Sequence, residues 1–220
     1  PDLSVGSAAR TVDAAGRLLC PGFIDLHAHS ALRPFDDPLL GAKIGQGFTT
    51  ELICPDGLGP APLTDATVDT RRRYLRGLEP STGAGWDWRS MQSYLDALQV
   101  TRPSANMISC VPHSAVRESV MGNANRPPDR REMSAMKDLV AESLSAGARA
   151  VSFGMIYAPG LYADTNEILQ IADTAAQYGV PLVPHVRNEA AGVIDSISEF
   201  VHVCEQTGAH LHVSHVKLVG

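Results

Sequence analysis

Residues 21–30 read PGFIDLHAHS, an apolar run that ends in two histidines separated by one residue. Side chains at positions i and i+2 of a strand point to the same face, so His27 and His29 can offer two imidazoles to one point. Two neutral imidazoles suit a divalent metal such as zinc. One strand end rarely completes a catalytic metal site, so we expect further ligands at the ends of other strands.

Short apolar runs recur along the chain and alternate with segments of helical periodicity. The predicted strands span 22–29, 49–56, 106–113, 148–156, 180–186 and 209–216. Most are rich in Val, Ile and Leu and are flanked by Gly or Pro, which is typical of buried parallel strands. The clearest predicted helices span 129–146, 164–178 and 190–206, and a glycine follows closely after each. This alternation predicts right-handed crossovers and a parallel sheet.

Six strand–helix units fit either an open doubly wound sheet or most of a (β/α)8 barrel. The glycine-rich phosphate fingerprint is absent from the sequence, which argues against a dinucleotide-binding fold. Long segments over 57–88 and 122–130 resemble the βα loops that build the active face of a barrel. We therefore expect an α/β fold of the TIM-barrel type, of which this chain covers about the first six strand–helix units.

The first 20 residues differ in character from the rest of the chain. The segment 11–19 resembles a short hairpin that leads into the first barrel strand, so residues 1–20 are predicted to end a small β-sandwich domain. Residues 21–220 are predicted to form the partial barrel. The start at Pro1 and the end directly after a predicted strand suggest that the natural protein continues beyond this chain.

Composition limits the classes of partner. With 44% hydrophobic and 19% charged residues, the 220-residue chain has the composition of a globular protein. A net charge of −6 gives no basic footprint for nucleic acid, and no apolar stretch approaches the length of a membrane span. The four cysteines lack C-x-x-C spacing, and no signal peptide opens the chain. A reducing cytoplasm is the simplest predicted compartment.

Polar side chains gather where the predicted strands end. In strand order they are His27 and His29, Cys54 and Asp56, His113, Tyr157, His185, and His215 with Lys217. In a barrel all of these positions face one mouth. An unpaired buried polar group costs about 1–3 kcal/mol, so six polar strand ends in register indicate a functional site.

The motif PGFIDLHAH resembles the opening metal motif of the amidohydrolase superfamily. Further blocks resemble its D-aminoacylase, or N-acyl-D-amino-acid deacylase, branch. These blocks are GFTT at 47–50, GPAP at 59–62, VPH at 111–113, IYAPG at 156–160, HVRNE at 185–189 and SHVK at 214–217. They occur in the family's order over nearly the whole chain, so their combination is more specific than any single block.

The resemblance implies two metal positions. His27 and His29 would hold one ion, and His185 and His215 would hold the other. The family commonly has a bridging cysteine after the second strand, whereas a gap-free match puts Asp56 at that position and leaves Cys54 as the alternative. A carboxylate makes the site harder than a thiolate does, so we expect one or two zinc ions and leave manganese or iron open.

The resemblance also implies the reaction, which is hydrolysis of an amide in a small N-acyl-D-amino acid by a metal-activated water. Tyr157 and Lys217 would contact the substrate. The family's general base is an Asp at the end of the eighth strand, so no catalytic residue is assigned in this chain. Arg187 and Glu189 are either supports for the ligands or an ordinary surface ion pair.

Two alternatives to deacylation stay open. One is another amidohydrolase reaction, such as that of a cyclic amidase (dihydroorotase or hydantoinase) or an isoaspartyl dipeptidase. The other is a barrel that binds metal without catalysis. Assembly as a homo-oligomer is also left open by the sequence.

Overall fold

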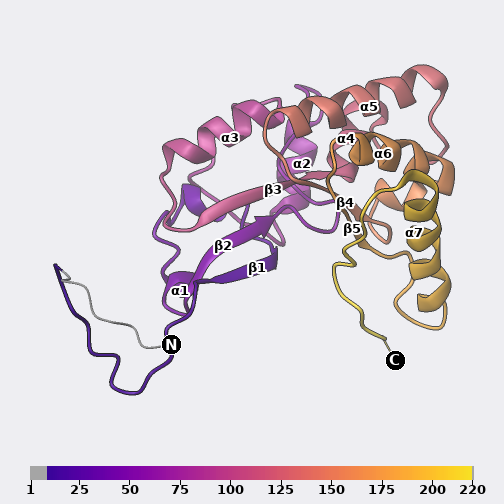
Figure 1. Ribbon diagram of the computed structural model, residues 1–220. Coiled ribbons are helices and arrows are strands. Elements are labelled where there is room, and N and C mark those ends of the chain that lie inside the picture. The colour runs from indigo at the N-terminus through magenta and orange to yellow at the C-terminus, as the bar shows by residue number, and fades with distance from the viewer. Residues whose placement is uncertain (1–8, 220) are drawn as a thin grey trace.

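A curved, fully parallel sheet forms the centre of the molecule in the computed structural model, which describes residues 9–219 (Figure 1). Its five strands lie side by side in chain order. They are β1 (Phe23–Ala28), β2 (Phe48–Ile53), β3 (Asn106–Pro112), β4 (Ala150–Gly154) and β5 (Leu182–His185). A doubly wound sheet reverses its strand order, whereas a barrel does not. The prediction of a partial TIM-type barrel is therefore confirmed.

Helices follow the strands and cover the outer side of the sheet (Figure 1). The long ones are α2 (Val68–Leu75), α3 (Met91–Val100), α4 (His113–Met121), α5 (Arg130–Ser145), α6 (Thr165–Gln177) and α7 (Val193–Thr207). The short ones are α1 (Gly41–Ile44) and the 3-10 turns η1 (Arg33–Phe35) and η2 (Gly160–Tyr162). The helices predicted over 129–146, 164–178 and 190–206 correspond to α5, α6 and α7. No described helix is long and apolar enough to cross a membrane.

The helix ends follow from their sequences. Asp129 precedes α5 and accepts hydrogen bonds from the backbone of Arg131 and Glu132, and the Glu132 side chain accepts from the Asp129 amide in return. This reciprocal arrangement satisfies amides that have no partner within the helix. At the far end of α7, Gly208 takes the left-handed conformation that stops a helix.

The main core lies between the sheet and the later helices. Phe153 of β4, Ile168 of α6 and Phe200 of α7 are fully buried, and the two phenyl rings meet edge to face at 5.4 Å. Burial of one such side chain contributes about 1.5–3 kcal/mol. This packing fixes β4 against the helices α6 and α7.

The segment expected as a sixth strand, 209–216, differs from the prediction. Only one isolated bridge, between Leu182 and Leu211, is formed. The backbone of His210, His212 and Ser214 still exchanges hydrogen bonds with β5, so the segment runs beside that strand without a regular ladder. Within the described residues no strand lies on its other side, so its backbone has hydrogen-bond partners on one side only.

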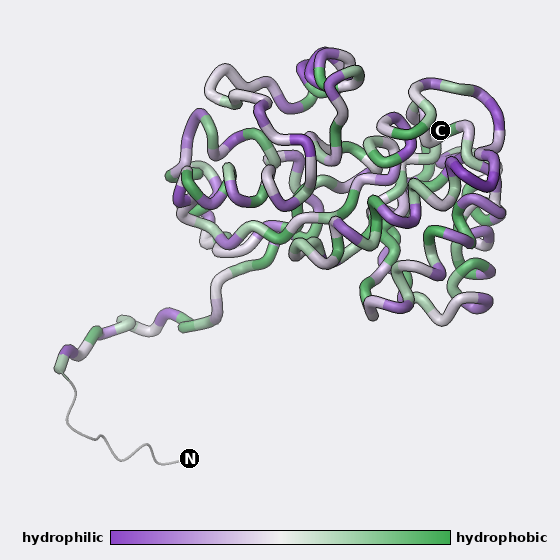
Figure 2. Tube along the Cα trace, turned by 90° about the horizontal axis from the view of Figure 1, so that it is seen from above, coloured by the Kyte–Doolittle hydropathy of each residue, from purple (hydrophilic) through white to green (hydrophobic). Residues whose placement is uncertain are grey.

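The N-terminal segment also differs from the expected hairpin. Residues 1–8 lie outside the described part, and residues 9–20 contain a turn at 15–16 but no strand. Figure 2 shows residues 9–20 running away from the body of the molecule. An exposed segment with one local turn has no partner strand with which to form a ladder. The division into a small β domain and a barrel stays a prediction.

Candidate metal centre

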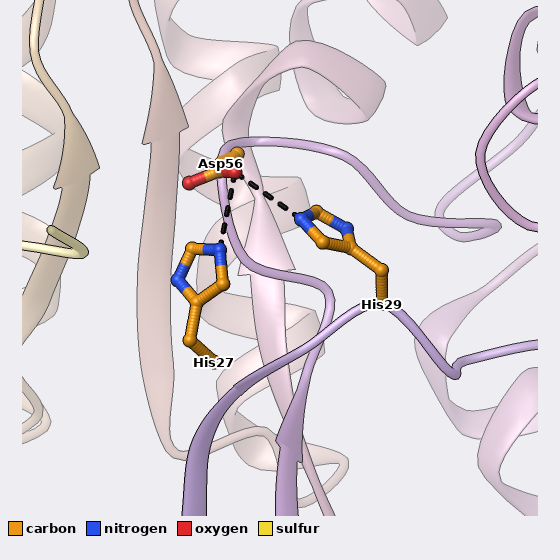
Figure 3. Close-up of side chains that lie close together, drawn as sticks. All are labelled: His27, His29 and Asp56. Carbon is orange, nitrogen blue, oxygen red and sulfur yellow. Dashed lines mark hydrogen bonds and ion pairs between the residues drawn. The ribbon is translucent and has the colours of Figure 1, made fainter.

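The first group of candidate ligands comes from β1 and the turn that follows β2. His27 lies within β1, and His29 follows it directly. Their Nε2 atoms lie 3.3 Å and 3.2 Å from the same atom, Oδ2 of Asp56 (Figure 3). The i and i+2 spacing thus brings both imidazoles to one point, as the sequence predicts.

The second group uses the other oxygen of the same carboxylate. Oδ1 of Asp56 lies 3.6 Å from Nδ1 of His185, the last residue of β5, and 3.8 Å from Nε2 of His215. Within each group the three donor atoms lie within 4.8 Å of one another. All five predicted ligands therefore meet, and Asp56 offers one oxygen to each pair of histidines.

The electrostatics of Asp56 fit a cationic partner. The residue is only 4% exposed, and this burial opposes its ionisation. The neighbouring imidazoles of His185, His27 and His29 outweigh the burial and hold the pKa of Asp56 well below its usual range. Oδ1 of Asp56 and Nδ1 of His185 are buried without a hydrogen-bond partner.

Such unpaired buried atoms cost about 1–3 kcal/mol each unless something binds them. Each group has two imidazole nitrogens and one carboxylate oxygen, which is a donor set suited to zinc and open to manganese or iron. The residues present therefore fit a divalent metal in each group. Their roles as ligands stay predictions.

Cys54, the alternative to Asp56, belongs to neither group. It is fully buried, its Sγ lies 3.6 Å from the Ser109 hydroxyl, and burial raises the pKa of its thiol well above the usual value. Because β2 ends at Ile53, strand parity does not carry on to Asp56. The backbone geometry supports Asp56 as the residue at the bridging position.

A second carboxylate supports the His185 and His215 pair from outside. Oε1 of Glu189 lies 3.4 Å from Nε2 of His185 and 3.0 Å from Nδ1 of His215. These are the ring nitrogens that face away from Asp56, and a carboxylate there fixes the tautomer and orientation of a ligand. Arg187 instead pairs with Glu199, at 2.9 Å between Nε and Oε2. Of the two residues, Glu189 alone contacts the candidate ligands.

Glu79, which the motifs did not indicate, lies beside His29. Its Oε1 is 3.9 Å from Nδ1 of His29, and its Oε2 accepts a hydrogen bond from the Leu32 amide at 3.1 Å. Burial raises the pKa of Glu79 to about 7, although the Leu32 hydrogen bond and the charge of His29 oppose this. Glu79 lies in the loop after α2, within the long segment between β2 and β3. The sequence indicates it only as an acidic residue in a loop near the barrel mouth.

The two predicted substrate contacts lie at the edge of this cluster. The Tyr157 ring is 5.0 Å from the His185 ring between centroids. Burial and the negative charges of Asp56 and Glu189 raise the pKa of Tyr157. The Lys217 side chain is 53% exposed, and its Nζ lies 3.1 Å from Oε2 of Glu189. His113 lies apart in the core, with its Nε2 2.8 Å from Oε1 of Glu167.

The fold and this geometry agree with the chain's relatives. The chain belongs to the amidohydrolase family, whose model matches residues 10–219. It is 34% identical to the N-acyl-D-glutamate deacylase of Alcaligenes xylosoxydans xylosoxydans, over 98% of this chain and 43% of that protein. It is 31% identical to the D-aminoacylase of the same organism, over 100% of this chain and 44% of that protein. The branch indicated by the motifs is confirmed.

Solved structures show the same likeness. A D-aminoacylase crystal structure superposes with a TM-score of 0.87 at 30% identity, covering 100% of this chain and 45% of that one. A second D-aminoacylase structure concerns the functional role of that enzyme's binuclear metal centre. The N-acyl-D-glutamate deacylase from Bordetella bronchiseptica, complexed with zinc and a phosphonate inhibitor, gives a TM-score of 0.76 at 32% identity over 87% of this chain and 39% of its own. The chain spans less than half the length of these relatives.

Proposed function

We propose that the protein containing this chain is a metal-dependent deacylase that hydrolyses the amide bond of N-acyl-D-amino acids. The position of Asp56 is the observation that carries the proposal, since one carboxylate offers an oxygen to each of two histidine pairs. The activities named for the similar proteins, D-aminoacylase and N-acyl-D-glutamate deacylase, support this substrate class.

We propose zinc as the metal. The donor set of imidazole nitrogens and a carboxylate suits it, and a relative of known structure was complexed with zinc. A divalent metal at this site supplies Lewis acidity, which polarises an amide carbonyl and lowers the pKa of a water molecule. His27, His29, His185 and His215 bind the metal in this proposal, and Asp56 is shared between the two positions.

The surrounding residues position these groups and the substrate. Oε1 of Glu189 lies beside the outer nitrogens of His185 and His215, where its charge would orient the rings so that their inner nitrogens face the metal. Tyr157 lies against His185, where its hydroxyl would reach the carbonyl of a bound amide. Lys217 is held by Glu189 and would turn to a substrate carboxylate at the exposed rim. The proton-transferring residue is assigned to no position in this chain.

The decisive test combines metal content with turnover in the full-length protein. We expect bound zinc, hydrolysis of N-acetyl-D-amino acids but not of their L-enantiomers, and loss of activity on chelation that added zinc restores. Comparison of N-acetyl-D-glutamate, N-acetyl-D-aspartate and N-acetyl-D-leucine identifies the preferred side chain. Bound metal with turnover of dihydroorotate or a hydantoin instead would favour a cyclic amidase. A protein that binds metal but turns over none of these amides would contradict an enzymatic role.

A further inference from the structure

The turn that carries Asp56 has an unusual backbone conformation. Cys54, Asp56 and Gly57 have φ angles of 61°, 56° and 65°, all in the left-handed region. Residues other than glycine rarely adopt this region, because it is strained for them. They are found there where the surrounding structure holds the backbone in place. Contacts from outside the turn must therefore keep Asp56 in place.

One side chain closes this turn by two hydrogen bonds. The hydroxyl of Ser152 donates to the carbonyl of Cys54 at 2.6 Å and accepts from the amide of Gly57 at 3.1 Å. These two backbone groups flank Asp56 on either side. Ser152 is fully buried in β4, which lies two places from β2 in the sheet.

The backbone of the turn also rests directly on β4. A Cβ added at Gly154 would lie 1.9 Å from the carbonyl oxygen of Asp56, and one added at Gly57 would lie 2.7 Å from the Gly154 amide nitrogen. No side chain fits between the two segments. The Ser152 hydroxyl thus acts where the turn and the strand are already in contact.

We propose that Ser152 is a positioning residue for Asp56 and thereby sets the affinity of both metal positions. This inference rests on the proposed function, because it requires Asp56 to be a metal ligand. The Ser152 hydroxyl is engaged by the Cys54 carbonyl and the Gly57 amide, so it acts on the ligands through the turn. Because Asp56 gives one oxygen to each group, a change in the turn alters both positions together.

Ser109 provides a matched control on the neighbouring strand. It is also a buried serine, but its hydroxyl donates to the carbonyl oxygen of Cys110 at 2.8 Å. Its contact with the turn is to the thiol of Cys54, and not to the backbone. Ser109→Ala therefore makes the same chemical change at a similar depth. It leaves the Cys54 carbonyl and the Gly57 amide with their partner.

The experiment measures zinc affinity of the full-length protein by competition with a chromophoric chelator, and the visible absorption of the cobalt-substituted form. We expect Ser152→Ala to weaken both zinc equivalents by about tenfold or more and to alter the cobalt spectrum, as loss of an outer support does. Ser109→Ala should leave both unchanged. Equal effects of the two variants, or wild-type affinities in Ser152→Ala, would overturn the positioning role.

Two further results separate the possible failures. A wild-type protein that binds no metal overturns the proposed function and this inference with it, whereas metal binding insensitive to Ser152→Ala overturns the inference alone. Should Ser152→Ala not fold, Ser152→Cys keeps the shape of the side chain with a somewhat larger terminal atom and weakens both hydrogen bonds. The same reduction of zinc affinity relative to Ser109→Ala is then expected, and its absence overturns the inference.

Discussion

One oxygen of Glu189 lies beside two candidate ligands, His185 and His215. Substitution of Glu189 should therefore affect the affinity of one metal position more than that of the other. Glu189→Ala removes the carboxylate that lies 3.4 Å from Nε2 of His185 and 3.0 Å from Nδ1 of His215. We expect about a 10- to 100-fold loss of zinc affinity at the position these histidines share, with a smaller effect at the other. Calorimetric titration of the full-length protein measures both.

Glu199→Ala is the control for the Glu189 prediction. It removes a carboxylate from the same region, but one that pairs with Arg187 away from the ligands. Equal losses in the two variants would mean that Glu189 acts only through the local charge.

Substitutions of His215 and His212 test which side chains of the segment beside β5 face the metal site. His215 lies 3.8 Å from Asp56 between Nε2 and Oδ1, whereas His212 contacts β5 through its backbone amide and belongs to neither ligand group. We expect His215→Ala to lose bound zinc on dialysis and His212→Ala to keep it, as measured by metal analysis. Retention of zinc in both variants would show that the segment 210–215 runs differently.

At the scale of the element, the start of α5 depends on its cap. Asp129→Ala removes the acceptor for two backbone amides and breaks the reciprocal bond with Glu132. We expect a loss of about 1 kcal/mol in the free energy of unfolding, measured with urea. Asp138→Ala removes the same charge from an exposed position within α5 and should cost much less. Similar costs would argue that net charge, and not the cap, is responsible.

Asp36, directly after η1, accepts hydrogen bonds from the loop after α2, and these hydrogen bonds depend on pH. The Ser81 hydroxyl, with the hydroxyl and amide of Thr82 and the amide of Gly83, lowers the pKa of Asp36 to about 2, although burial opposes the shift. A carboxylate with a lowered pKa stabilises the fold above its unfolded pKa of 3.8 and loses this contribution as the pH falls towards about 2.

Asp36→Ala tests this dependence. Because Asp36 is exposed and solvent screens its charge, we expect the variant to be less stable than the wild type by no more than about 1 kcal/mol near neutral pH, with the difference vanishing towards about pH 2. Urea unfolding at a series of pH values measures the difference. A difference that does not change with pH would show that the ionised form of Asp36 is not the stabilising species.

Elements with a strong local pattern were predictable, and those fixed by tertiary contacts were not. The apolar runs gave β1 to β5, and the periodicity with capping residues gave α5 to α7. The segment α4 was missed because it begins at His113, a residue that the sequence places at a strand end. In the site, the spacing of His27 and His29 predicted that they lie together. Glu79 and Ser152 could not be predicted, because each contacts residues that are far away in the sequence.

At the scale of the whole molecule, the candidate ligands join parts of the chain that are far apart in sequence. They come from β1, from the turn after β2, from β5 and from the segment that follows α7. A ligand that binds only the folded state stabilises it, by about 2.7 kcal/mol at 100 times its dissociation constant. We expect chelation to lower the thermal unfolding midpoint and zinc to restore it. A midpoint that does not respond to zinc would contradict a site built from these segments.

The shared carboxylate of Asp56 also has a thermodynamic consequence. A carboxylate that served a single divalent ion would give its whole negative charge to that ion, whereas a carboxylate shared by two ions would divide that charge between them. Two ions at this site would also repel each other at short range. At the proposed site, a second ion would therefore bind more weakly than the first, and this coupling would be reciprocal. We therefore expect the metal stoichiometry to follow the zinc supply, with chains that hold one ion and chains that hold two present together over a range of free zinc concentrations.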